Sequence, residues 1–138
     1  MSAERIHAEL KFTHDSRFLP GVRAAVEFIA ARDGLSDAER ENLGAASELL
    51  ARECMAGLGE KDPPCKVQIE DFDDRIEVRL EHAARPAEAS GAGASKAGTP
   101  AARGAEVMRR VDRVLYDARN GISSVTLVKF FSKNPAAR

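Results

Sequence analysis

The sequence lacks several features that would place it in a specialised class of protein. It has no run of about 18 apolar residues, so no transmembrane helix is expected. Its two cysteines, Cys54 and Cys65, match no metal or redox spacing, which predicts small buried side chains in a reducing compartment. The net charge of −1 gives no overall field to attract nucleic acid or an acidic membrane. Residues 1–5 lack the pattern of a signal peptide, so we expect a cytoplasmic protein.

The amino-terminal half predicts one strand and two helices within a single domain, residues 1–138. Apolar and polar residues alternate over residues 5–13, as in a half-buried strand. A helix follows, beginning near Ser16 or Leu19 and ending at Gly34. Ser36 and Glu39 then form a capping box that opens a long helix, which we expect to end around residues 57–59.

The other half predicts a hairpin, a long loop, a helix and a strand. The hairpin strands are expected over residues 65–72 and 75–82, with Val67, Ile69, Ile76, Val78 and Leu80 inward. Residues 83–103 hold no apolar residue larger than alanine except proline, and a loop this long is either functional or disordered. Valines at helical spacing predict a helix over residues 107–115, with Tyr116 near its end. Asn120-Gly121 predicts a turn, and residues 123–131 a strand buried on both faces.

This order of elements predicts an α/β (α+β) two-layer sandwich. We expect a four-stranded mixed, mostly antiparallel sheet with three helices on one face. The order and the segments Arg17–Arg23, Ser47-Glu48 and Val125–Phe130 resemble the bacterial anti-sigma regulatory factors, which are serine-protein kinases. The resemblance covers nearly the whole chain and implies the histidine-kinase-like ATPase fold, with residues 83–103 in the place of its flexible ATP lid.

The resemblance also assigns candidate roles on the second helix. In that family a Glu orients or activates the attacking hydroxyl or water, and an Asn four residues later holds magnesium. Glu48 matches the Glu, which makes it the candidate catalytic residue, but Arg52 stands where the Asn would be. A guanidinium has only donors and a positive charge, so it cannot ligate magnesium. Two interpretations remain open: Arg52 contacts a phosphate directly, or Glu48 and Arg52 form an i,i+4 ion pair.

Two further motifs of the family are altered. Where the family has Asp-x-Gly-x-Gly, with an Asp that accepts from adenine, this chain has Glu81 followed by His82-Ala83-Ala84-Arg85. The added side chains stand where bare backbone is needed. Gly104 lies roughly where the family has its phosphate-binding loop, and Arg103 is a candidate anion contact.

These substitutions predict a regulator that binds proteins, with Mg-ATP binding impaired or lost: either no cofactor, or ATP without a normal magnesium site. The resemblance implies a sigma factor or an anti-sigma antagonist as partner, and a homodimer, since family members commonly dimerise. One alternative is an active ATP-dependent serine kinase that phosphorylates an antagonist. Another is a small-ligand or anion sensor that uses Glu48, Arg52, Glu81 and Arg103.

Overall fold

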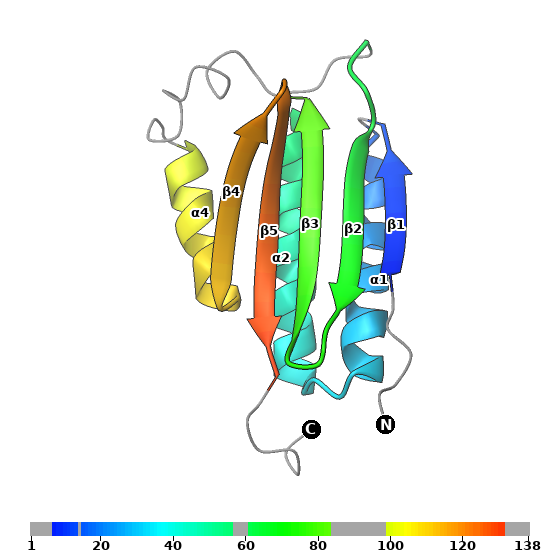
Figure 1. Cartoon of the computed structure of the whole chain (residues 1–138), viewed down its shortest axis with the longest axis vertical. Coiled ribbons are helices and arrows are strands. Elements are labelled where there is room, and N and C mark those ends of the chain that lie inside the picture. Colours follow the sequence, from blue (N-terminus) through cyan, green and yellow to red (C-terminus); the bar gives the residue numbers. More distant parts are fainter. Residues whose placement is uncertain (1–6, 14, 57–60, 84–98, 132–138) are drawn as a thin grey trace.

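The fold is an antiparallel sheet with helices on one face (Figure 1), as described by a computed structural model. The structure describes residues 7–13, 15–56, 61–83 and 99–131, with the backbone alone for 99–104. The elements are, in chain order, β1 His7–Phe12, a 3₁₀ turn Ser16–Phe18, α1 Leu19–Arg32, α2 Asp37–Ala56, β2 Cys65–Asp71, β3 Arg75–Ala83, α4 Thr99–Arg110, β4 Arg113–Arg119 and β5 Ile122–Phe130.

The sheet has five strands in the order β1-β2-β3-β5-β4, and every neighbouring pair is antiparallel. The prediction of a four-stranded mixed sheet was therefore wrong. The helix predicted over residues 107–115 is present, but only its residues 107–110 are helical. The helix ends at Arg110, and Arg113–Arg119 form the additional strand. The turn predicted at Asn120-Gly121 connects this additional strand to β5. Asn120 and Gly121 both have positive φ, 51° and 77°, as in the tight turn that returns a chain directly onto the neighbouring strand.

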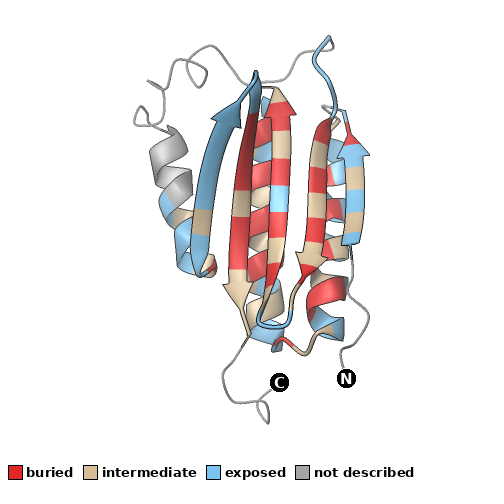
Figure 2. Cartoon of the chain, viewed as in Figure 1, coloured by how far each residue is buried: buried red, intermediate tan, exposed pale blue. Residues whose placement is uncertain are grey.

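The core lies between the sheet and the helices. The residues predicted to point inward on β2 and β3 are all fully buried: Val67, Ile69, Ile76, Val78 and Leu80. They alternate with half-buried or exposed residues along each strand, which gives the banding in Figure 2. The predicted strand over residues 123–131 is also largely buried. Cys54 and Cys65 are both buried, as predicted.

The three helices lie on one face of the sheet, with α1 and α4 both packed against α2 (Figure 1). The predicted capping box is present. The Glu39 amide donates to Ser36 Oγ at 3.1 Å, and the Ser36 amide donates to Glu39 Oε1 at 2.9 Å. Gly34 ends the preceding helix with a φ of 88°. Within the described residues, no helix has the length and apolar character needed to cross a membrane.

The segment predicted as a lid-like loop, residues 83–103, is not a single loop. Ala83 is the last residue of β3, and residues 99–103 are the first five of α4. Residues 84–98 lie outside the described part of the chain. Pro100 is compatible with the helix Thr99–Arg110 because it falls in the first turn, where its missing amide hydrogen is not needed.

Candidate functional site

Glu48 lies between two arginines, one on each of the packed helices α1 and α2. Its Oε1 is 3.5 Å from Arg23 Nη1, and its Oε2 is 3.6 Å from Arg52 Nη2. The side chain of Glu48 is 20% exposed and that of Arg52 56% exposed. The predicted i,i+4 ion pair between Glu48 and Arg52 is thus confirmed. The carboxylate that the resemblance offers as a base is also paired with a cation from α1.

Arg23 also contacts a second carboxylate, that of Glu27, which adds a fourth charged residue to Glu48, Arg23 and Arg52. Its Nε donates to Glu27 Oε2 at 2.8 Å. That hydrogen bond is the main reason why the pKa of Arg23 is raised above its ordinary value, with a smaller contribution from Glu48. Glu27, Arg23, Glu48 and Arg52 therefore form a chain of alternating charges across the two helices, which we call the α1–α2 charge network. Each cation in it has a carboxylate partner.

Glu27 reaches this position because α2 has a glycine beneath it. A Cβ atom at Gly44 would lie 2.6 Å from Glu27 Oε2 and 2.7 Å from Glu27 Cγ. Both distances are far shorter than any real contact, so only glycine lets the Glu27 side chain lie so close to the backbone of α2. Gly44 is itself buried.

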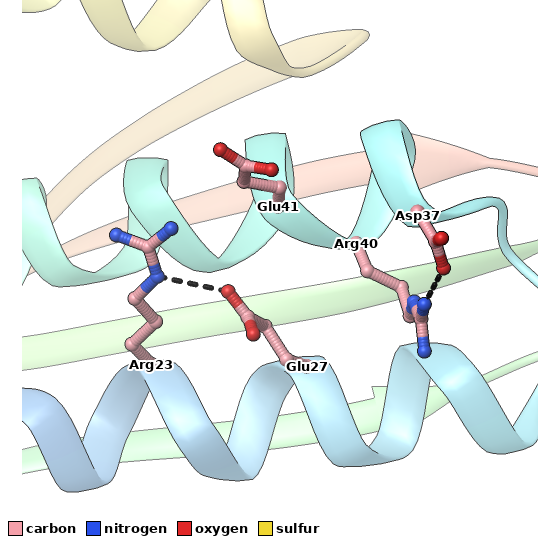
Figure 3. A pocket seen from close by; sticks show the side chains of 5 residues that line it. All are labelled: Arg23, Glu27, Asp37, Arg40 and Glu41. Atoms are coloured by element: carbon pink, nitrogen blue, oxygen red, sulfur yellow. Dashed lines mark hydrogen bonds and ion pairs between the residues drawn. The ribbon is translucent and has the colours of Figure 1, made fainter.

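A shallow hollow opens beside the network, between α1 and α2 (Figure 3). It is lined by Arg23, Glu27, Asp37, Arg40 and Glu41. Asp37 forms an ion pair with Arg40, and Glu27 pairs with Arg23, so both guanidinium groups are already matched. Three carboxylates against two guanidinium groups give the lining a net negative charge. This hollow is a poor match for a triphosphate, which is itself strongly negative.

Glu81 lies on the other side of the sheet from the network. Its neighbours on β3, Leu80 and His82, are buried against the helices, so the alternation of the strand turns Glu81 to the outer face. There it pairs with Lys66 Nζ at 3.4 Å and with Arg79 Nε at 3.0 Å. The expected pocket that combined Glu48, Arg52 and Glu81 was therefore wrong, because the sheet separates Glu81 from the two others.

Gly104 and Arg103 belong to α4. Gly104 is the sixth residue of this helix, beyond the first turn, so its amide is part of the helical ladder rather than of a phosphate-binding loop. Gly104, which the resemblance places roughly where the family has its phosphate-binding loop, therefore lies in a helix and not in a loop. The side chain of Arg103 lies outside the described part of the structure.

His82 and Ser123 form a buried polar pair that sequence reasoning did not select. They are directly opposite each other on β3 and β5, and they are only 5% and 6% exposed. His82 Nδ1 is 2.9 Å from Ala83 O, and because a carbonyl only accepts, this nitrogen carries the proton. The signal was present in the sequence: His82 continues the inward series Ile76, Val78, Leu80. The pair faces the helix layer at the end of β3, just before the segment of residues 84–98.

The comparisons with known proteins give this site no precedent. No model of a known protein family matches the chain, and no curated protein is similar to it in sequence. In the described part of the chain, no group of three or more His, Cys, Asp or Glu side chains is arranged to hold a metal ion.

Proposed function

We propose that this protein is an anti-sigma-factor-like regulator with a histidine-kinase-like ATPase fold, acting by binding a protein partner and with Mg-ATP binding impaired or lost. The observation that carries the proposal is the solvent-facing side of α1. The fold assignment is supported by the order of the elements, and by three helices packed on one face of the sheet.

The solvent-facing side of α1 is apolar from Pro20 to Ala31. Phe28, in the second half of the helix, is 71% exposed. The other exposed residues at helical spacing around it are small or apolar: Pro20, Gly21, Ala24 and Ala31. An exposed aromatic ring on an apolar strip is typical of a protein-binding surface, since aromatic residues often supply much of the binding energy. The charged residues Arg17 and Arg32 flank the strip at its two ends.

Loss of Mg-ATP binding is supported by the α1–α2 charge network. A magnesium ion bridging phosphates needs oxygen ligands, and Arg52 puts a positive charge where such a ligand would stand. Glu48 forms two ion pairs, so its carboxylate is not free to act as a general base. Glu81, on the outer face of the sheet, is not available to accept from an adenine bound on the helix side.

The alternative is an active ATP-dependent serine kinase that phosphorylates an antagonist protein. It is favoured by Glu48, which is retained on α2 and is partly exposed. In that case partner binding would be accompanied by transfer of phosphate from ATP to the partner. Stabilisation by ATP without magnesium would instead indicate Arg52 as a direct phosphate contact.

The test is a calorimetric titration of the chain with purified sigma factors and antagonist domains from its own genome. We expect one of them to bind without ATP. The Phe28→Ser variant should weaken that binding at least tenfold with little change in stability, since the ring is exposed. Ile122→Ser, which removes another exposed apolar side chain on β5, is the matched control and should bind like the original chain. Absence of binding to all candidates, or equal binding by Phe28→Ser, would contradict the proposal.

A further inference from the structure

β4 is an edge strand that the rest of the described chain leaves open. It pairs with β5 on one side only. Residues 115–119 are all exposed, and β4 is pale blue in Figure 2 except for one tan band near its start. The strand contains no proline, and its pairing with β5 runs through all seven residues without a bulge. Proteins commonly protect an edge by proline or by a bulge, because an open edge offers unpaired amides and carbonyls to another strand.

Two neighbouring residues expose apolar side chains on opposite faces of this edge. Leu115 is 53% exposed and Tyr116 is 65% exposed. Tyr116 lies opposite Val125, on the helix side of the sheet, so Leu115 lies on the outer face. A partner docked flat on either face would cover only one of the two side chains. A strand added at the edge would flank both, because its own side chains also alternate between the faces.

The sequence of β4 fits an antiparallel copy of itself in one register. In an antiparallel pair of strands, two residues that lie opposite each other both direct their amides toward the partner strand, or both direct them away from it. When the two strands are copies of each other, the two-fold axis must therefore pass between one residue and the same residue of the copy. An axis at Leu115 places Leu115 against Leu115, Arg113 against Asp117, and Val114 against Tyr116. An axis at Tyr116 would oppose Arg113 and Arg119, and one at Asp117 would bring two carboxylates together. Of these three registers, the one centred on Leu115 pairs opposite charges and covers the apolar residues. Asp117 also forms an ion pair with Arg119 of its own strand, at 3.0 Å, so in this register it lies between two arginines.

We infer that two copies of this chain associate through β4, antiparallel and centred on Leu115, to form one continuous ten-stranded sheet. The other edge, β1, is the weaker candidate. Its Phe12 is buried and its Leu10 half-buried, so it exposes no large apolar side chain among the described residues. This inference is independent of the proposed function, since it concerns a different surface from α1.

Sedimentation velocity of the full chain over a wide range of concentration tests the inference. We expect a monomer–dimer equilibrium, because a single pair of strands buries a small interface. Arg113→Asp and Asp117→Arg should each weaken the dimer at least tenfold, since both place like charges opposite each other twice. The double variant Arg113→Asp/Asp117→Arg restores opposite charges and should regain most of the affinity. A chain that is monomeric at every concentration would overturn the inference.

Oxidative crosslinking tests the register even if a charge variant folds poorly. Leu115→Cys places two cysteines directly opposite each other, at a separation that a disulfide spans. Ile122→Cys is the control: Ile122 is also exposed, at 42%, but lies on β5 away from the axis. We expect crosslinked dimer from Leu115→Cys and much less from Ile122→Cys. Equal crosslinking, or a dimer insensitive to both charge reversals, would show that another surface is used.

Discussion

Glu27 of α1 lies directly over Gly44 of α2, so closely that a Cβ atom at Gly44 would be 2.6 Å from Glu27 Oε2. The contact holds the Glu27 carboxylate at the start of the α1–α2 charge network, where it accepts from Arg23 at 2.8 Å. A glycine in the middle of a helix is normally a cost of about 1 kcal/mol relative to alanine. Here the cost is offset by the packing that the missing side chain allows.

The first prediction is that Gly44→Ala and Glu27→Ala are energetically coupled. Alone, Gly44→Ala should gain little stability, because the new methyl group displaces Glu27 from Arg23. In the Glu27→Ala background the same change should stabilise the chain by about 1 kcal/mol, the ordinary helix propensity of alanine. Chemical denaturation of the four proteins measures the coupling. Equal effects in both backgrounds would show that the Glu27–Gly44 contact carries no energy.

A second prediction concerns Asp33, the C-cap residue of α1. Burial, and then the hydrogen bond and charge of Asp71, raise the pKa of Asp33 from 3.8 to about 6. At a pH between these two pKa values, Asp33 keeps its proton in the folded chain but has lost it in the unfolded chain. The free energy of unfolding therefore falls as the pH rises from about 4 to 6. This loss of stability is complete above about pH 6 and is absent below the pKa of Asp33 in the unfolded chain, 3.8.

Asp33→Asn should therefore stabilise the chain near neutral pH, by on the order of 1 kcal/mol after allowance for solvent screening. The gain should shrink toward zero near about pH 4. Urea denaturation of both proteins across this range measures it. A gain that is the same at every pH would mean that the carboxyl group of Asp33 does not titrate as described.

The capping box gives a third prediction. Ser36→Ala removes the acceptor for the Glu39 amide and should destabilise the chain by about 1 kcal/mol. Ser16→Ala is the matched control, since Ser16 is an exposed serine in a turn that Asp15 caps. It should change stability by less than about 0.5 kcal/mol. Thermal denaturation separates the two, and equal losses would deny the capping box its role.

The strands and helices with one buried face were predictable from sequence, whereas β4 was not. Alternation fixed the inward residues of β2 and β3, because their two faces differ in polarity. β4 is an exposed edge strand with no buried face, so its apolar and polar residues do not alternate in the way that identifies a strand from sequence. Val107 and Val111 do belong to the buried side of the molecule, and Val114 continued their helical spacing by coincidence.

The candidate site was only partly predictable, for a different reason. Glu48 and Arg52 are one turn apart on one helix, so their ion pair follows from local geometry. Arg23 and Glu27 join them only through the packing of α1 on α2, which no local pattern contains. Glu81 was selected for its carboxylate, although the alternation of β3 assigns the helix-facing position to His82.

A thermal-shift titration with ATP tests most directly the claim that Mg-ATP binding is lost. A ligand at about 100 times its dissociation constant stabilises a protein by about 2.7 kcal/mol, a shift of several degrees for a domain of this size. We expect no rise in melting temperature at sub-millimolar ATP with magnesium. Glu81→Ala, on the outer face of the sheet, should behave in the same way. A magnesium-dependent rise that is lost in Glu48→Ala and kept in Glu81→Ala would contradict the account.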